Sequence, residues 1–178
     1  MNEKEVVRKS KFLSLVLRHD PGRIGIILDS AGWTLVDNLL IKTNLSMDEL
    51  EYIVENNNKK RFEFNDDKTK IRASQGHSLN VDLGYEEKDP PETLYHGTAE
   101  RFIDSIKQKG ISKQKRHHVH LSDNISTAKN VGQRHGKSIV IAINSRSMKE
   151  NGHKFYLSTN GVWLTEFVPV KYIGEISQ

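Results

Sequence analysis

The sequence contains no cysteine, which excludes disulfide bonds and zinc sites with cysteine ligands. No apolar run approaches the roughly 18 residues needed to span a bilayer, and the first residues lack the apolar core of a signal peptide. No G-x-G-x-x-G pattern occurs, so nothing indicates a Rossmann dinucleotide site. These absences predict a cytoplasmic protein that does not bind a membrane.

The composition is typical of a globular protein, with 35% hydrophobic and 28% charged residues among 178. This length suits one large domain or two small lobes. Residues 1–90 hold 14 Lys or Arg and 16 Asp or Glu, a net charge of −2, whereas residues 91–178 hold 13 and 7, a net charge of +6. A basic half attracts polyanions, but so small an excess is also common on ordinary surfaces, so charge alone does not identify the ligand.

The first half shows the signals of helices followed by a hairpin. Asn2 and Glu5 form a capping-box pattern, and the helix that they begin is expected to end near His19, because Asp20 precedes a proline. The remaining predicted elements are a short helix capped by Asp37, a helix with the capping-box pair Ser46 and Glu49 that ends at residues 56–58, and a β-hairpin of residues 61–65 and 70–74. Three helices and then a hairpin are the order of a winged-helix module.

The second half is predicted to be richer in strands. Residues 84–91 combine a glycine, four charges and two prolines, which is typical of a linker. The expected elements after it are strands at 93–96, 118–121, 138–143, 155–157, 162–164 and 168–173, a helix capped by Thr98 and closed by Gly110, and a helix capped by Ser122. The whole chain is therefore expected to have an α+β fold.

Two motifs resemble known ligand sites, a phosphate-binding loop and a metal site, but neither interpretation is favoured. Residues 132–138 resemble a phosphate-binding loop, but one residue is missing between the glycines and the segment precedes a strand instead of following one. His117, His118 and His120 suggest a metal site, but no third and fourth ligand stand nearby in the sequence. We therefore predict no metal, and we expect these histidines to form hydrogen bonds.

Polar and cationic residues gather at two places in the first half. Arg18 and His19 lie at the predicted C-terminus of the first helix, where cationic side chains often serve only as helix caps. Arg72 lies on the hairpin, where an arginine is usually a solvated surface residue. It is followed closely by further donors, which are Gln75, His77 and Ser78, and such a set suits a phosphate dianion.

At these residues the chain resembles the RNA 2′-phosphotransferases, the NAD-dependent KptA/TPT family. The matching stretches occur in the family's order along nearly the whole chain: 14–19, 32–33 with 36–37, 61–62, 71–78, 81–83, 91–98, 118–122, 131–136 and 160–165. The departures are few, since Ser138 and Val170 stand where the family usually has proline, and neither has an expected chemical role.

The resemblance implies two lobes: residues 1–84 as a winged-helix lobe that binds RNA, residues 85–91 as a linker, and residues 92–178 as an ADP-ribosyltransferase-like lobe that binds NAD. It also implies roles for individual residues. The expected catalytic residues are Arg18, His19, Arg72 and Arg134; the expected RNA-binding residues are Arg18, His19, Arg72, Gln75, His77 and Ser78; and the expected NAD-binding residues are Tyr95, His96, Gly97, Thr98, His120, Leu121, Ser122 and Arg134, with a hydrophobic residue near Val162.

The reaction implied by the resemblance removes an internal 2′-phosphate from RNA. The phosphate is transferred to NAD through an ADP-ribosylated RNA intermediate, and no metal or obligate protein partner is expected. Two alternatives remain open: an ADP-ribosyltransferase that modifies nucleic-acid ends or protein and stops after the first step, and a nucleic-acid-binding protein without activity. The set of cationic residues in both lobes argues against inactivity.

Overall fold

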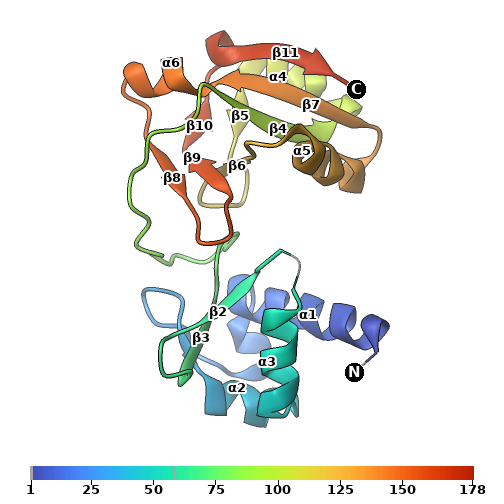
Figure 1. Ribbon diagram of the computed structural model, residues 1–178, viewed down its shortest axis with the longest axis vertical. Coiled ribbons are helices and arrows are strands. Elements are labelled where there is room, and N and C mark those ends of the chain that lie inside the picture. Colours follow the sequence, from blue (N-terminus) through green and yellow to red (C-terminus); the bar gives the residue numbers. More distant parts are fainter. Residues whose placement is uncertain (1, 58) are drawn as a thin grey trace. The chain divides into compact units, whose positions relative to one another are not determined.

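The computed structural model describes residues 2–57 and 59–178, and these form two compact units (Figure 1). The first unit ends at Gly84 and the second is Tyr85–Gln178. Residues 85–91, which we expected to be a linker, pack on the second unit: the Lys88 N–H donates to the Phe155 carbonyl at 2.8 Å, and Glu87 pairs with Lys149. None of the described helices has the length and apolar character needed to cross a membrane.

Two of the three α-helices described in the first unit begin where local capping signals predict. Its helical elements are α1 Glu3–Arg18, the 3-10 helix η1 Pro21–Ile24, α2 Val36–Thr43 and α3 Met47–Glu55. Both capping boxes are confirmed, the first formed by Asn2 with Glu5 and the second by Ser46 with Glu49. The prediction for Asp37 is wrong, because it lies inside the first turn of α2 and the N-cap, Leu35, offers no side-chain hydrogen bond.

A three-stranded antiparallel sheet completes the first unit. Its strands are β1 Thr34–Leu35, β2 Phe62–Phe64 and β3 Lys70–Ala73, in the order β1-β3-β2. The predicted hairpin is confirmed, and its register pairs Glu63 with Arg72. Ile71 and Ala73 of β3 are fully buried against the helices, so Arg72 lies on the opposite face of the strand.

The second unit is mixed helix and strand, so the α+β prediction holds. Its helices are α4 Ile103–Lys109, α5 Ile125–Gly132 and α6 Ser145–Glu150, with 3-10 helices η2 Glu100–Phe102, η3 Gln133–His135 and η4 Val170–Tyr172. Its strands are β4 Thr93–Ala99, β5 Ile111–Ser112, β6 Val119–Leu121, β7 Ser138–Asn144, β8 Phe155–Leu157, β9 Trp163–Thr165, β10 Phe167–Val168 and β11 Ile173–Ser177. They form sheets β11-β7-β4, β6-β9-β8 and β10-β5.

Three predictions for this unit are wrong at their boundaries. Thr98 does not cap a helix, because β4 continues through it and pairs with β7. Ser122 does not cap α5; Asn124 does, by accepting from the Thr127 N–H at 3.0 Å. Residues 168–173 are not one strand but the end of β10, η4 and the start of β11.

Helix α5 lies very close to strand β4 because two glycines permit it. A side chain at Gly97 would overlap the carbonyl oxygen of Ala128, and one at Gly132 would meet the backbone of Thr98. Helix α5 and the following η3 therefore lie directly beside the strand that carries the expected NAD-binding residues.

Candidate functional site

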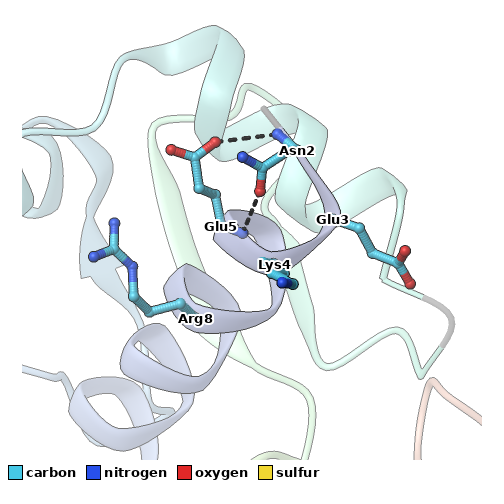
Figure 2. A pocket seen from close by; sticks show the side chains of 5 residues that line it. All are labelled: Asn2, Glu3, Lys4, Glu5 and Arg8. Atoms are coloured by element: carbon cyan, nitrogen blue, oxygen red, sulfur yellow. Dashed lines mark hydrogen bonds between the residues drawn. The ribbon is translucent and has the colours of Figure 1, made fainter.

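A surface hollow lies at the start of α1 (Figure 2). None of the residues predicted to bind a substrate or to take part in catalysis lines it. It is lined by Asn2, Glu3, Lys4, Glu5 and Arg8. The side chains of Asn2 and Glu5 each accept a hydrogen bond from the other residue's backbone N–H, as in a capping box. Arg18 lies at the other end of the same 16-residue helix, about 24 Å away at 1.5 Å per residue, so the hollow lies apart from the predicted site residues at the C-terminus of α1.

The C-terminus of α1 brings together three of the predicted RNA-binding residues. The Ser78 N–H donates to the Arg18 carbonyl at 3.0 Å, and the Ser78 hydroxyl lies 2.9 Å from Nδ1 of His19. Arg18 reaches inward, and its Nη2 donates to the Arg61 carbonyl at 3.5 Å. The negative end of the helix dipole favours cationic side chains at this position.

Arg72 is held by an acid, a carbonyl and an aromatic ring. Its Nε donates to Glu63 at 2.6 Å, its Nη1 donates to the Ala31 carbonyl at 3.3 Å, and its guanidinium lies 4.4 Å from the ring centre of Trp33. The side chain is only 15% exposed, so its orientation is well fixed. Within the described part of the chain, Nη2 of Arg72 donates to no other residue, so this group can donate to an anion.

The loop at Gly32 links the two clusters. Gly32 precedes Trp33, which stacks on Arg72, and a side chain at Gly32 would lie 3.4 Å from Nε2 of His77. His77 is 2% exposed and precedes Ser78, which bonds to the end of α1. The structure therefore gathers Arg18, His19, Arg72, His77 and Ser78 in one neighbourhood of the first unit.

Gln75 also belongs to this neighbourhood by its position between β3 and Ser78. Its Oε1 is buried and accepts no hydrogen bond from the described residues. Leaving a buried carbonyl oxygen without a hydrogen bond costs roughly 1–3 kcal/mol. An unsatisfied oxygen of this kind is typical of a site that can bind a donor group.

In the second unit, His96 and His120 are adjacent on neighbouring strands. Nδ1 of His96 lies 3.1 Å from the His120 carbonyl, which can only accept, so His96 carries its proton on Nδ1. Arg116 Nη1 lies 3.2 Å from Nδ1 of His120, and an arginine can only donate, so His120 carries its proton on Nε2. The two imidazoles therefore have opposite tautomers, with Nε2 of His96 as an acceptor.

His96 is held neutral by its surroundings. Burial lowers the pKa of His96 below the ordinary histidine value of 6.5. The hydrogen bond to the His120 carbonyl opposes this shift, and electrostatic interactions with Arg116 and His135 add to it. Near neutral pH this side chain is uncharged, which suits an uncharged hydroxyl ligand better than a phosphate.

The other predicted NAD-binding residues of these strands serve mainly the fold. Tyr95 and Ser122 exchange two backbone hydrogen bonds, of 2.7 and 2.8 Å, that join β4 to the end of β6. Thr98 and Leu121 are 7% and 3% exposed, and Gly97 lies against α5. Of these residues, Gly97 is needed for the close approach of α5, and His96 and His120 remain as the groups that could meet a ligand.

Arg134 lies in η3, next to β4, and its side chain is exposed. Among the described residues, none forms an ion pair or a hydrogen bond with the Arg134 side chain. Residues 132–138 run from the last residue of α5 through η3 to the first residue of β7, so the segment lacks the strand-before-helix order of a nucleotide phosphate loop.

The histidine-rich segment before β6 does not form a ligand cluster. Within residues 2–57 and 59–178, no group of three or more His, Cys, Asp or Glu side chains is placed to hold a metal ion. His118 instead packs beside the rings of Tyr85 and Tyr156, at 6.4 and 5.5 Å between ring centres.

Sequence reasoning missed three residues that position the site: Glu63, Trp33 and Arg116. Glu63 could have been found, because the predicted hairpin register places it opposite Arg72. Trp33 contacts Arg72 across 39 positions of sequence, and the Arg116 bond to His120 depends on how its loop folds, so neither has a local signal.

Comparison with known proteins gives a consistent result. A family model described as RNA 2′-phosphotransferase, Tpt1/KptA family, matches residues 4–167. Similar proteins, each named probable RNA 2′-phosphotransferase, include those of Flavobacterium johnsoniae (52% identity over 178 residues; 97% of this chain and 98% of that protein), Fusobacterium nucleatum (51% over 173 residues; 94% and 97%) and Nostoc punctiforme (48% over 181 residues; 99% and 100%).

Proposed function

The chain belongs to the RNA 2′-phosphotransferase family, and from this premise we propose that it removes an internal 2′-phosphate from RNA by transferring it to NAD. The products would be RNA with a 2′-hydroxyl, nicotinamide and ADP-ribose 1″,2″-cyclic phosphate. In this proposal the first unit is a winged-helix lobe that binds RNA, supported by its three helices and small antiparallel sheet. The second is an ADP-ribosyltransferase-like lobe that binds NAD.

One observation carries the proposal: the donor set at the end of α1 and on β3. Arg18, His19, Ser78 and Arg72 supply charged and neutral donors from fixed positions, and phosphate recognition requires such donors. Glu63 accepts from Nε of Arg72 and the Ala31 carbonyl accepts from Nη1, so Nη2 is the group that can bind an oxyanion.

In the first step, the RNA 2′-phosphate attacks the ribose carbon of NAD that bears nicotinamide. A phosphate oxygen forms the new bond to carbon, and nicotinamide departs with the electrons of the bond it breaks. We assign NAD to the second unit, where Nε2 of His96 can accept a hydrogen bond from a ribose hydroxyl. The protein mainly orients the two reactants in this step.

In the second step, the neighbouring 2″-hydroxyl of the ADP-ribose attacks the same phosphorus. The RNA 2′-oxygen leaves and gains a proton, and the cyclic phosphate forms. Negative charge grows on the phosphorus oxygens, so Arg18, Arg72 and His19 would stabilise this transition state. His19 can also transfer a proton in this step, a role that histidine side chains often have in catalysis. We assign Arg134 to a phosphate group from the second unit.

Product analysis tests the proposal. The protein is incubated with an RNA oligonucleotide that has one internal 2′-phosphate, with and without NAD. We expect NAD-dependent formation of 2′-hydroxyl RNA, nicotinamide and the cyclic phosphate. Accumulation of ADP-ribosylated RNA would indicate a transferase that stops after the first step, and unchanged RNA would indicate a binding protein.

A further inference from the structure

A groove of about 360 Å³ lies between two loops of the first unit. Its apolar lining comes from Ile26, Ile27 and Leu28 in one loop and from Leu79 and Val81 in the other. This volume is near the lower end of the roughly 300–1,000 Å³ of small-ligand pockets. The groove is therefore large enough for one flat ring system.

Ile27 is the most exposed large hydrophobic side chain among the described residues, at 84%. A single exposed isoleucine is ordinary on a protein surface. Ile27, however, lines the groove together with other apolar side chains and with the polar Asp29, Ser30 and Asn80, and such a mixture of apolar and polar groups is typical of a ligand site.

Both sides of the groove continue directly from the proposed phosphate-binding residues. Leu79 follows Ser78, whose hydroxyl lies 2.9 Å from His19. Pro21, which also lines the groove, is two residues after His19, so their Cα atoms are at most about 7.6 Å apart. The loops are also tied to each other, because the Asp82 N–H donates to the Ser30 carbonyl at 2.7 Å.

We propose that this groove binds the nucleobase of the nucleotide that carries the 2′-phosphate. Its flat face packs on Ile27 and Val81, and the amide of Asn80, which lines the same groove, bonds to its edge. Proteins commonly recognise single-stranded RNA by packing splayed bases on side chains and bonding to their edges. An asparagine offers both donors and an acceptor for this purpose. The proposal rests on the proposed function.

The nucleobase is chosen over other occupants for a chemical reason. Within the substrate, the base of that same nucleotide is the apolar, planar group joined most directly to the 2′-phosphate. A phosphate held by His19 and Ser78 would therefore bring this base to the loops that follow those residues.

The experiment combines protein variants with substrate variants. Ile27→Ser removes the exposed apolar side chain, and Ile41→Ser is the matched control, because Ile41 is 72% exposed on α2 of the same unit and does not line the groove. Each protein is assayed for kcat/KM, and for RNA affinity without NAD, on two RNAs: one intact and one abasic at the 2′-phosphorylated nucleotide.

With the intact RNA we expect Ile27→Ser to lower both quantities about tenfold, at the lower end of the effect of losing one base contact. With the abasic RNA, wild type and Ile27→Ser should be equal, and Ile41→Ser should match wild type on both. A second variant is Asn80→Ala. For this variant the differences in kcat/KM among RNAs with different bases at the 2′-phosphorylated nucleotide should become smaller, while activity on abasic RNA stays the same.

Two results would overturn the groove assignment while leaving the proposed function intact: equal activity of wild type on intact and abasic RNA, or an equal loss by Ile27→Ser on both RNAs. If wild type acts on neither RNA, the proposed function itself is wrong, and the groove assignment is lost with it.

Discussion

The two units differ in the charge of the side chains that they offer to a ligand. In the first, Arg72 and the end of α1 present positive and polar donors that are fixed by Glu63, Trp33 and Ser78. In the second, His96 and His120 form a neutral pair with opposite tautomers. Charged donors suit a phosphate dianion and neutral imidazoles suit a ribose, so the contrast supports different substrates for the two units.

Net charge does not reveal this contrast. Residues 1–90 contain the arginines proposed to bind phosphate, yet their net charge is −2, whereas residues 91–178 have a net charge of +6. Anion binding depends on where a few donors are fixed and not on the total charge of a half.

The largest expected effect comes from Gly97→Ala. The added methyl group would overlap the carbonyl oxygen of Ala128, so α5 must move away from β4. We expect the second unit to lose about 3 kcal/mol of stability while the first unit keeps its own. Each unit has one tryptophan, so denaturant unfolding can be followed by Trp163 in a Trp33→Phe background and by Trp33 in a Trp163→Phe background.

Gly174→Ala is the control for this change. The nearest atom to its added methyl group would be the Ala142 carbonyl oxygen, at 3.4 Å, so we expect a change within about 1 kcal/mol. Equal destabilisation of both units by Gly97→Ala would show that they do not unfold independently.

The second largest effect concerns the phosphate donors. Arg72→Ala and His19→Ala should slow the second step by about 100-fold, and the first step less, because charge grows on the phosphate oxygens only in the second step. ADP-ribosylated RNA should therefore accumulate in a time course with labelled RNA and excess NAD. Lys68→Ala, in the same hairpin, should behave as wild type. If both mutants lose the two steps in equal proportion, these residues only bind RNA.

A smaller effect is expected from the histidine pair. His96→Ala and His120→Ala should each weaken NAD binding about tenfold, corresponding to about 1.4 kcal/mol, and leave affinity for 2′-phosphorylated RNA unchanged. Calorimetric titration with each ligand measures both, and His153→Ala is the control in the same unit. Intact NAD binding with lost RNA binding would reverse our assignment of the units.

The pH dependence of stability just below pH 6.5 should be smaller still, and we expect it in the second unit, where burial lowers the pKa of His96 and of His118. Because burial lowers the folded pKa of His96 below 6.5, the unfolded chain binds more protons just below that pH. The stability of the second unit should therefore fall as pH decreases below 6.5 and level off once pH passes below the folded pKa. Unfolding of the Trp33→Phe protein at several pH values measures this. His96→Gln should reduce the slope, and an unchanged slope would show that another group causes it.

The smallest expected effect is that of metal removal, which should be none. Phosphate charge is assigned to Arg18, Arg72 and His19, so turnover in EDTA should equal turnover without it. Activity that is lost in EDTA and restored by zinc or magnesium would contradict this.

Local features of the fold were predictable from sequence. The capping boxes at Asn2 and Ser46 and the hairpin of β2 and β3 depend on residues three to eleven positions apart, and all three are confirmed. Thr98 and Ser122 also looked like helix caps, but the same residue types occur at strand ends. Pairing of β4 with β7, which is a tertiary interaction, decided the first case.

Motifs name the candidate site residues, whereas most of their partners, apart from Glu63 opposite Arg72, have no local signal in the sequence. Arg18, His19 and Ser78 could be named from motifs, but the bond between His19 and Ser78 joins residues 59 positions apart. Only tertiary packing forms such contacts. The tautomers of His96 and His120 likewise follow from neighbours that no local pattern identifies.

The most direct test of our central claim is to follow the phosphorus itself. An RNA whose only label is ³²P in its internal 2′-phosphate is incubated with the protein and NAD, and the labelled products are separated. We predict that the label moves to ADP-ribose 1″,2″-cyclic phosphate, in step with nicotinamide release. Label released as inorganic phosphate without a need for NAD would show a phosphatase and would contradict the account.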